Sequence, residues 1–387
     1  MRILMLAPTP YFSDRGCHVR IFEEARELQA RGHAVEIVTY HLGRDVGGIP
    51  VTRTPRIPWY RKTEAGPSWH KPYLDILLFF TALCAVRRFR PDVIHAHLHE
   101  GAFVGALLKL FVGVPLLFDC QGSLCGELLD HGFMRRNGFL HRMFAVLERW
   151  IVRRADAIVT SSTPTAEAMK NDFPERSERL RSLPDAVDVG SFRPLPVDAA
   201  LREQLGIPAG KRVVVYLGAM TTYQGVDLLL DVLTTLAAQR DDFHALLMGY
   251  PEAEYVRRAS ALGLSDRVTF TGRIDYAEAP RYLALGVIAV SPKLSATEAN
   301  GKLLNYLACG LPCVVFDTPV NRELLGDVGI YAVYGDVEDY GRCLDDLLDN
   351  PDRLTILSHQ SRDHAVANHS WAARVDVLEG VYAGMTG

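Results

Sequence analysis

Hydrophobic and polar positions follow two periods along the chain, one typical of strands and one of helices. Short runs rich in Val, Ile and Leu are followed by segments whose apolar residues repeat every three or four positions. The runs are RILMLAP, GHAVEIVTY, PDVIHAH, VPLLFDC and ADAIVTSS in the first half, and RVVVYLGAM, FHALLMGY, RVTFTGR, GVIAVSP and PCVVFDT in the second. Continuous apolar runs that alternate with helices predict parallel sheets covered by helices.

The repeating pattern is interrupted by the Pro-rich, irregular stretch SLPDAVDVGSFRPLPVD at residues 182–198. A chain of 387 residues is also too long for one ordinary hydrophobic core. We therefore predict the α/β class, with two Rossmann-like, doubly wound domains over residues 1–188 and 189–369. A helix at residues 370–387 can join the N-terminal domain.

Composition places the chain among globular proteins, because 48% of its residues are hydrophobic and 23% are charged. The first apolar run is too short for a signal peptide, and the longest, Ile76–Val86, is well short of the roughly 20 residues that cross a bilayer. The seven cysteines are an odd set without metal-like pairing, which favours reduced, mostly buried thiols. We therefore expect a cytoplasmic protein.

The net charge of −4 conceals an asymmetry between the two halves. Residues 1–190 carry 25 Lys and Arg against 21 Asp and Glu, a balance of +4, whereas residues 191–387 carry 17 against 25, a balance of −8. This difference indicates that the halves meet different partners. The basic residues are not interleaved with aromatic residues as in nucleic-acid-binding modules, so we expect no nucleic-acid partner.

The stretch SATEANGKLLNYLACGLPCVV, at residues 295–315, combines a polar turn, a short apolar helix, a Gly stop and a strand. A helix N-terminus of this kind offers backbone N–H groups and a positive dipole end to an anion. Glu298, Lys302 and Asn305 share one face if the helix starts near Asn300. The carboxylate and the amide can then hold sugar hydroxyls while the lysine faces a phosphate. The alternative is a solvated helix start with a Glu–Lys pair.

Five segments together resemble the family 4 retaining glycosyltransferases of the GT-B fold: GKLLNYLACGLPCVV, YLGAMTTYQGVDLLLDVL, ALGLSDRVTFTGR, PDAVDVGSFRP and RGHAVEIVTY. The resemblance covers nearly the whole chain in the expected order. It implies two Rossmann-like domains that face each other across a cleft, the first holding the acceptor and the second a nucleotide-diphosphate sugar. It implies no cofactor and no metal, in agreement with a sequence that has no DxD motif and no clustered His and Cys ligands.

The resemblance also implies roles for residues of the second domain. The base would lie near Arg273 and Ile274, and the ribose near Asn305. The diphosphate would lie on the turn at Asn300–Leu303, and the sugar near Glu298. The donor-binding residues that we predict follow strands or lie at this helix start: Gly16, Gly218, Gln224, Gly249, Arg273, Ile274, Asn300, Gly301, Leu303 and Asn305.

Four positions depart from the family pattern. The usual Arg and Lys of the phosphate-binding loop fall at Ala219 and Gln224, and the second Glu of the usual pair falls at Asn305. The loop His that often touches the donor sugar falls at Gln121. Loss of a charge-assisted contact costs about 1.5–3 kcal/mol, for which Lys302 can compensate in part. Gln224, Asn305 and Gln121 keep hydrogen-bonding ability, which favours a divergent active enzyme over a decayed one.

Catalysis in such retaining enzymes is described as front-face substitution, in which a donor phosphate oxygen helps to remove the acceptor proton. The protein then supplies placement and stabilises the departing diphosphate. We predict that Glu298 orients the donor sugar and that Lys302 stabilises the phosphates. Asp119 follows a strand and either faces the acceptor hydroxyl or the sugar, or caps the following turn.

The run HAHLHE offers three histidines, of which His97 is the candidate for an acceptor-side contact because it ends a predicted strand. No further cluster of ligands joins these histidines along the sequence, so we do not expect a zinc site. The first loop, PTPYFSDRGCHVR, keeps only Gly16 of the family's Gly-rich loop. We expect Gly16 and His18 to approach the donor phosphates or the acceptor, and we place His18 and Gln121 on the acceptor side.

Two N-terminal stretches, ILLFFTALCAVRRFR and HGFMRRNGFLHRMFAVLERWIVRR, mix apolar residues with arginines. They are either ordinary sheet-covering helices or surfaces that contact the inner face of an anionic membrane. The sequence thus predicts a retaining hexosyltransferase that uses a nucleotide-diphosphate sugar and a lipid-linked or glycan acceptor. The alternatives are an enzyme for a nucleotide-monophosphate sugar and a non-catalytic scaffold or regulatory subunit that binds a sugar nucleotide.

Overall fold

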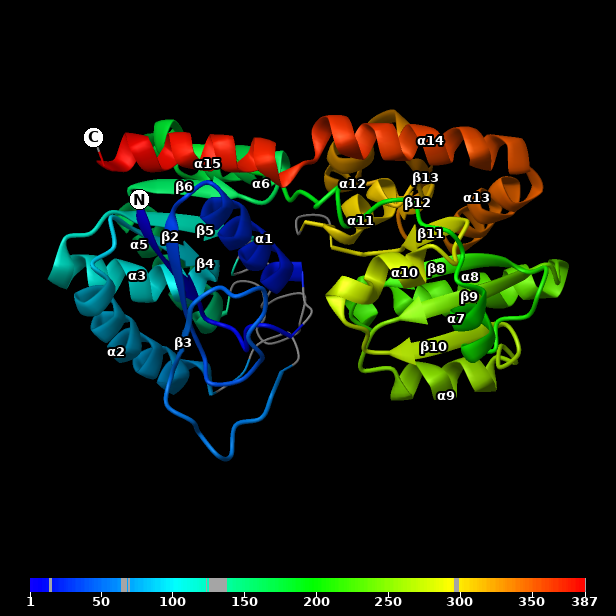
Figure 1. The fold of residues 1–387 in the computed structure, drawn as a ribbon, viewed down its shortest axis with the longest axis horizontal. Helices are drawn as coiled ribbons and strands as arrows, with labels where there is room; N and C mark the ends of the chain where they lie inside the picture. The colour runs from blue at the N-terminus through cyan, green and yellow to red at the C-terminus, as the bar shows by residue number, and fades with distance from the viewer. Residues whose placement is uncertain are drawn as a thin grey trace. The chain divides into compact units, whose positions relative to one another are not determined.

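The computed structural model describes residues 1–13, 16–63, 68, 70–122, 124, 138–295 and 299–386. The chain divides into two compact units. Among the described residues, the N-terminal unit contains those from Met1 to Asp185, Ala299 and those from Trp371 onward, and the C-terminal unit contains those from Ala186 to Ser295 and from Asn300 to Ser370. The helix that the sequence predicted near the C-terminal end therefore packs with the N-terminal unit (Figure 1).

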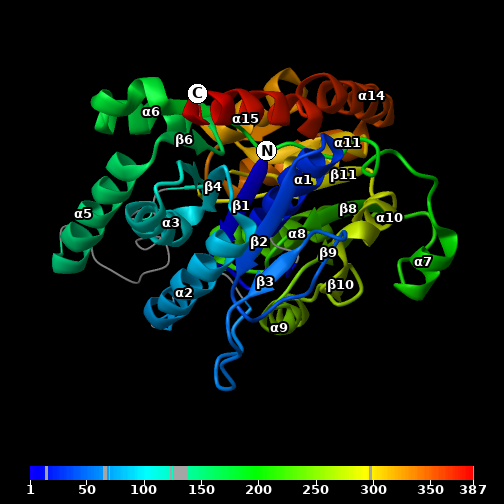
Figure 2. The same ribbon diagram turned by 60° about the vertical axis from the view of Figure 1, so that its left-hand side comes forward.

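The N-terminal unit contains a seven-stranded parallel sheet in the order β3-β2-β1-β4-β5-β6-β7. Its elements are β1 (Arg2–Ala7), α1 (Gly16–Ala30), β2 (Ala34–Thr39), β3 (Val51–Arg53), α2 (Lys71–Phe89), β4 (Val93–His97), α3 (Leu98–Val112), β5 (Leu116–Cys120), α5 (Phe139–Arg154), β6 (Ala157–Thr160), α6 (Thr163–Asp172), the 3₁₀ helix η1 (Pro174–Arg179), β7 (Leu180–Ser182) and α15 (Trp371–Thr386). Helices α1 and α15 cover one face of the sheet, and α2, α3, α5 and α6 cover the other, where they share one core cluster (Figures 1 and 2).

The C-terminal unit contains a six-stranded parallel sheet in the order β10-β9-β8-β11-β12-β13. Its elements are α7 (Ala199–Gln204), β8 (Arg212–Leu217), η2 (Thr222–Gln224), α8 (Val226–Gln239), β9 (Phe243–Met248), α9 (Ala253–Ala261), β10 (Val268–Gly272), η3 (Tyr276–Glu278), α10 (Ala279–Leu283), β11 (Ile288–Ser291), α11 (Lys302–Ala308), β12 (Cys313–Phe316), α12 (Pro319–Leu325), η4 (Gly326–Val328), β13 (Ile330–Ala332), α13 (Val337–Asp349) and α14 (Pro351–Asn368).

Burial on both faces of each sheet explains why the strands read as continuous apolar runs. In β8, Val214 and Tyr216 belong to the core cluster under α8 and α13, whereas Val213 and Val215 belong to the cluster under α11 and α12. Successive side chains of a strand point to opposite faces, so both sets must be apolar. The predicted fold class, α/β with two Rossmann-like, doubly wound domains, is confirmed.

The same alternation places polar side chains inside the N-terminal unit. Ile94 and Ala96 of β4 and Phe118 of β5 belong to the core cluster with α2 and α3. His95 and His97 of β4 therefore point to the opposite face, which α1 and α15 cover. The pairing of β4 with β5 sets His97 directly beside Asp119. This register brings the predicted residues of two strands into one buried group.

Candidate functional site

Lys302, the first residue of α11, is the centre of a polar group in the C-terminal unit. Its Nζ donates a hydrogen bond to Oε1 of Gln224 at 2.6 Å and lies 4.6 Å from the centre of the Tyr216 ring. Gly218 follows β8, and a Cβ added there would lie 2.7 Å from the same Nζ. The structure thus brings together Gly218, Gln224 and Lys302, three of the residues predicted at the donor.

The electrostatics of Lys302 favour an anionic ligand. Burial and then the charge of Lys293 lower the pKa of the Lys302 ammonium well below its ordinary value. Within the described ranges, which omit residues 296–298, no ion pair joins Lys302 to a carboxylate. An anion placed beside Nζ would offset the cost of holding the ammonium in its charged form.

The predicted glycines at the ends of β8 and β9 lie against each other. A Cβ added at Gly249 would lie 1.7 Å from the carbonyl oxygen of Gly218, so only glycine allows this approach. The Gly249 N–H donates to the carbonyl of Gly272 at 3.0 Å, which fixes the end of β9 beside the end of β10. These glycines therefore shape the carboxyl edge of the sheet, where doubly wound folds bind ligands.

The turn before α11 differs in detail from the expected anion site. Asn300 is buried, and its amide donates to Ser291 at 3.1 Å and to Asn321 at 3.0 Å. The N–H of Leu303 donates to the Asn300 carbonyl at 3.0 Å, so this predicted phosphate donor is occupied within the turn. The helix itself starts at Lys302, after Gly301.

The remaining predicted donor residues lie apart from these contacts or outside the described ranges. Asn305 is half-buried in α11, and its carbonyl accepts the N–H of Cys309. Arg273 is exposed, with its guanidinium 5.3 Å from the Tyr250 ring centre, and Ile274 packs at the edge of the core. Glu298, predicted to hold the sugar, lies outside the described residues.

Ala219 and Gln224 follow β8, at the positions where the resemblance implied two cations. The carbonyl of Ala219 accepts a hydrogen bond from the Tyr216 hydroxyl at 2.8 Å. Gln224 is buried and holds Lys302 through its amide oxygen. The lysine of α11 thus stands next to the position that the family's usual loop lysine would occupy.

In the N-terminal unit, Asp119 is the hub of a buried network. Its carboxylate accepts two hydrogen bonds from Arg20, at 2.8 and 3.0 Å, and one from Nε2 of Gln121 at 2.9 Å. The same carboxylate lies 2.8 Å from Nδ1 of His97. Asp119, which the sequence predicted as a site residue or a turn cap, thus contacts both His97 and Gln121, the residues predicted on the acceptor side.

His97 and Asp119 have no accessible surface, so an acceptor could reach them only after neighbouring side chains move. His18 is also buried, and its Nδ1 accepts the N–H of Ser13 at 2.9 Å. Gly16 is exposed at the start of α1. The part of the first loop between residues 13 and 16 lies outside the described ranges.

The network contains residues that the sequence reasoning missed. Arg20 and Glu24 come from the same face of α1, with Arg20 Nε 3.2 Å from a Glu24 oxygen. His95, stacked on His97 with ring centres 4.2 Å apart, also contacts the Tyr382 hydroxyl of α15. The sequence did contain one sign of this network. Arg20 and Glu24 are charged residues four positions apart, on a helix face that the core buries.

Burial and mutual charge shift the pKa values of the network. Burial alone would raise the pKa of the Asp119 carboxyl, but the Arg20 charge and the hydrogen bond from His97 hold it well below its ordinary value. Burial raises the pKa of Glu24 and lowers those of His95 and His97. Asp119 is therefore ionised and both imidazoles are neutral.

Two family profiles match most of the chain. A profile described as "Glycosyl transferase 4-like domain" matches residues 15–186, and one described as "Glycosyl transferases group 1" matches residues 211–350. Among curated proteins, the chain is 28% identical to 2-deoxystreptamine N-acetyl-D-glucosaminyltransferase of Streptomyces fradiae, with 89% of this chain and 85% of the relative covered. It is also 28% identical to D-inositol 3-phosphate glycosyltransferase of Thermobispora bispora, with 95% and 89% covered.

Solved structures share the fold across the full chain. The sucrose-phosphate synthase of Thermosynechococcus elongatus superposes with a TM-score of 0.83 at 18% identity, covering 99% of this chain and 98% of that one. Anabaena HepE, solved with UDP and glucose, gives a TM-score of 0.77 at 17% identity, covering 99% and 100%. The two Rossmann-like units and the two profiles define a glycosyltransferase. The chain belongs to family 4 of the GT-B glycosyltransferases, as a divergent member.

Proposed function

We propose that the protein transfers a hexose from a nucleotide-diphosphate sugar with retention of anomeric configuration. The observation that carries this proposal is the half-buried Lys302 at the carboxyl edge of the second sheet, whose ammonium is held by Gln224 and Tyr216. A diphosphate is the anion that such a cation suits. Anabaena HepE forms a complex with UDP and glucose, which supports the same donor class here.

In the proposed mechanism, Lys302 and the turn before α11 take up the negative charge that grows on the departing diphosphate. The protein thus serves the reaction mainly by placement and charge stabilisation, without a metal at the phosphates. A donor phosphate oxygen removes the proton of the attacking hydroxyl. Because Ala219 and Gln224 are uncharged, Lys302 carries a larger share of this stabilisation than it would beside the family's usual cations.

We propose a lipid-linked or glycan acceptor for the N-terminal unit. A second candidate is a cyclitol, because the curated relatives are named after 2-deoxystreptamine and D-inositol 3-phosphate. Both candidates present a ring hydroxyl to the donor carbon. They differ in whether the protein must work at a membrane surface.

We also propose that the N-terminal unit binds anionic membrane surfaces through α2, α3 and α5, which lie side by side (Figure 2). None of the described helices is long and apolar enough to cross a membrane. The three helices nevertheless expose large apolar side chains: Ile76, Phe80, Leu110, Phe111, Phe139, Met143 and Val146. Exposed arginines of α2 and α5 accompany them: Arg87, Arg88, Arg142, Arg149, Arg153 and Arg154.

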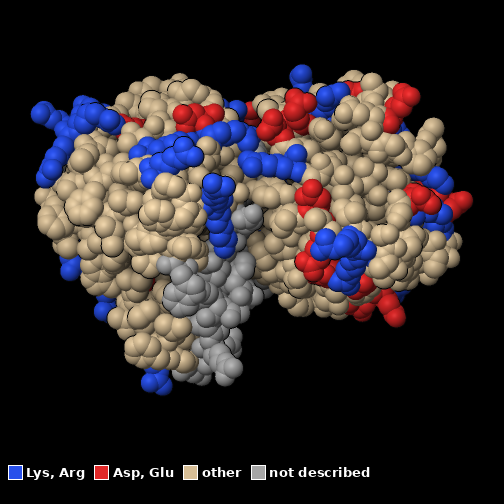
Figure 3. All heavy atoms as spheres, turned by 90° about the horizontal axis from the view of Figure 1, so that it is seen from below, with Lys and Arg blue, Asp and Glu red and all other residues tan. Residues whose placement is uncertain are grey.

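Charge supports this assignment. Figure 3 shows mainly basic side chains on the visible face of the N-terminal unit, and both signs on that of the C-terminal unit. Apolar side chains mixed with arginines suit an interface that contains anionic lipid, where each basic residue near the surface adds about 1 kcal/mol. This surface would bring the N-terminal unit close to a lipid-linked acceptor.

The first experiment is a thermal-shift screen of the purified full chain with UDP, GDP, ADP and CMP and their common sugars. One nucleoside diphosphate should raise Tm well above the rest. The matching sugar donor should then be hydrolysed slowly without acceptor, and NMR of the transfer product should show the donor's own anomeric configuration. An inverted product would contradict the retaining mechanism. Stabilisation by CMP alone would contradict the diphosphate donor.

Donor hydrolysis also separates an enzyme from a scaffold. A chain that binds the diphosphate sugar tightly but neither hydrolyses it nor transfers it to phosphoinositol, aminocyclitol or lipid-linked acceptors would be a regulatory subunit.

A further inference from the structure

A cluster inside the N-terminal unit presents potential metal ligands at one point. The Nε2 atoms of His95 and His97 and Oε2 of Glu24 have no hydrogen-bond partner among the described residues, whereas Oε1 of Glu24 lies 3.2 Å from Nε of Arg20. All three side chains are inaccessible to solvent, where unpaired polar atoms are costly. We propose that Glu24, His95 and His97 bind a divalent transition-metal ion, with Zn²⁺ as the ion that this ligand set favours.

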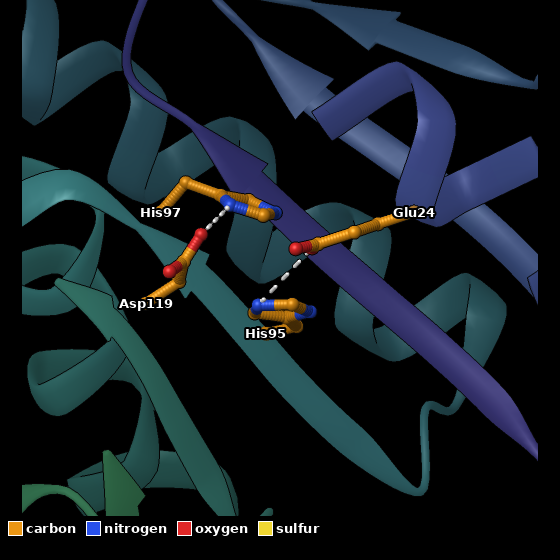
Figure 4. Close-up of side chains that lie close together, drawn as sticks. All are labelled: Glu24, His95, His97 and Asp119. Atoms are coloured by element: carbon orange, nitrogen blue, oxygen red, sulfur yellow. Dashed lines mark hydrogen bonds and ion pairs between the residues drawn. The ribbon is translucent and has the colours of Figure 1, made fainter. Parts of the chain in front are cut away.

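The geometry suits a common ligand. One potential ligand atom from each of Glu24, His95, His97 and Asp119 lies within 4.8 Å of all the others. Oε2 of Glu24 is 3.8 Å from Nε2 of His95. Figure 4 shows the Glu24 carboxylate and the two imidazole rings directed toward one another. A Zn²⁺ ion at about 2.0–2.2 Å from nitrogen and oxygen would draw these atoms slightly closer.

Asp119 prepares His97 as a ligand. The ionised Asp119 carboxylate can only accept, so the hydrogen bond of 2.8 Å requires the proton on Nδ1 of His97. The Nε2 atom of the neutral ring then carries a lone pair directed into the cluster. A carboxylate behind a metal-binding histidine is the usual means of fixing ring orientation and tautomer. Asp119 thus acts as a positioning residue, since its own oxygens are engaged with Arg20, His97 and Gln121.

Tyr382 serves His95 in the same way. Its hydroxyl oxygen lies 2.8 Å from Nδ1 of His95 and can accept a proton held there. Nε2 of His95 is then free to bind the ion beside Glu24. The two rings are stacked with an interplanar angle of 29°, and because His95 and His97 are two positions apart on β4, both lie on the same side of the strand.

The acidic side chains around the cluster outnumber the basic ones. The carboxyl groups of Glu24, Asp119 and Asp185 surround one guanidinium, that of Arg20, at 3.2, 2.8 and 2.8 Å. A divalent cation bound by Glu24, His95 and His97 would therefore enter a buried space that is lined mainly by acidic groups.

The bound ion would tie α1 to β4 inside the N-terminal unit, whereas the proposed nucleotide site is built from residues of the C-terminal unit. The inference is therefore independent of the proposed function. Removal of the ion should lower the stability of the N-terminal unit while the affinity for nucleoside diphosphate stays unchanged.

The test uses the full chain, dialysed against a chelator, loaded with Zn²⁺ or Co²⁺ and desalted. About one ion per chain should remain by elemental analysis, and Tm should rise by several degrees. The Co²⁺ form should absorb in the visible region with the bands of nitrogen and oxygen ligands. Less than about 0.1 ion per chain and an unchanged Tm would overturn the proposal and leave a water or a proton in the cluster.

Glu24→Gln removes the anionic ligand with little change in shape and should reduce the retained metal at least tenfold. Glu23→Gln is the matched control, because Glu23 is a buried neighbour on the same helix that pairs with Arg26 instead. Retention of the ion by Glu24→Gln would place it elsewhere and contradict the proposal. If Glu24→Gln does not fold, His95→Gln provides the same test, and the Co²⁺ spectrum and chelator-dependent Tm of the unmodified chain remain decisive.

Discussion

At the scale of single residues, Lys302 links burial to the chemistry of the donor. Tyr216, Gln224 and Lys293 surround it, and burial followed by the Lys293 charge lowers its pKa. A bound diphosphate would favour the ammonium and raise this pKa again. Binding should therefore take up a proton wherever the free protein holds Lys302 partly neutral.

We predict that the affinity for nucleoside diphosphate falls as pH rises through the lowered pKa of Lys302. Calorimetry in two buffers of different ionisation enthalpy would measure the proton uptake directly. Lys302→Met should weaken binding at least about tenfold, the effect of losing a charge-assisted hydrogen bond of about 1.5–3 kcal/mol. It should also abolish the proton uptake.

Lys211→Met is the control for this experiment, because Lys211 precedes the opposite end of β8 and donates to the Asp241 carbonyl. Its affinity and proton uptake should match those of the unmodified chain. Equal binding by Lys302→Met and Lys211→Met would remove Lys302 from the donor site.

At the scale of elements, the contact between the ends of β8 and β9 depends on Gly249. We predict that Gly249→Ala destabilises the protein by about 1–3 kcal/mol, because the new Cβ would force the Gly218 carbonyl aside. Nucleotide binding should weaken with it, since Gly218 borders Lys302. Urea unfolding and nucleotide titration measure the two effects.

The matched control is Gly341→Ala in α13 of the same unit, where a Cβ meets no atom within 4 Å. This change should stabilise the protein by about 0.5–1 kcal/mol, because alanine favours a helix. If Gly249→Ala were as stable as Gly341→Ala, the Gly218 carbonyl would be able to shift without lowering the free energy of unfolding, and the prediction would be wrong.

The strands and helices could be predicted from the sequence because their hydrophobic periodicity depends only on residues that are close together in the chain. The helix of the 295–315 stretch ends where Gly310 takes a φ of 72°, and β12 follows from Cys313, as the pattern indicated. The contact of Lys302 with Gln224 could not be predicted in the same way. It joins α11 to η2 across 78 residues and depends on how the two elements pack.

The buried network shows why the rest of a site escapes sequence reasoning. The sequence around the histidines of β4 shows no cluster of metal ligands. Glu24 is separated from His95 by 71 positions and comes from a helix on one face of the sheet. Strand alternation fixes the face of His95 and His97, but only packing selects the helix that covers it. A charged pair on the buried face of α1 was the local sign of such a network.

At the scale of the whole molecule, the exposed apolar face of α2, α3 and α5 predicts binding to vesicles that contain anionic lipid. Phe111→Ser and Ile76→Ser should each weaken sedimentation with such vesicles by about tenfold, because a membrane would bury each side chain for about 1.5–3 kcal/mol. Raised salt should weaken binding further, since it screens the arginines.

Ile356→Ser in α14 tests specificity, because Ile356 and Ile76 both have 58% of their surface exposed but belong to different units. Vesicle binding should be unaffected by this control. Loss of binding in all variants alike, or no binding by the unmodified chain, would contradict a membrane-binding face.

Helix α15 sets the order in which the protein can be completed during synthesis. It supplies Tyr382 to His95 and acidic partners to Arg31, yet it is translated after every residue of the C-terminal unit. A nascent chain on the ribosome therefore exposes the α1 face of its first sheet until the second unit has emerged. The N-terminal unit is therefore completed only after the C-terminal unit has been synthesised. A chaperone that shields this face would act throughout elongation.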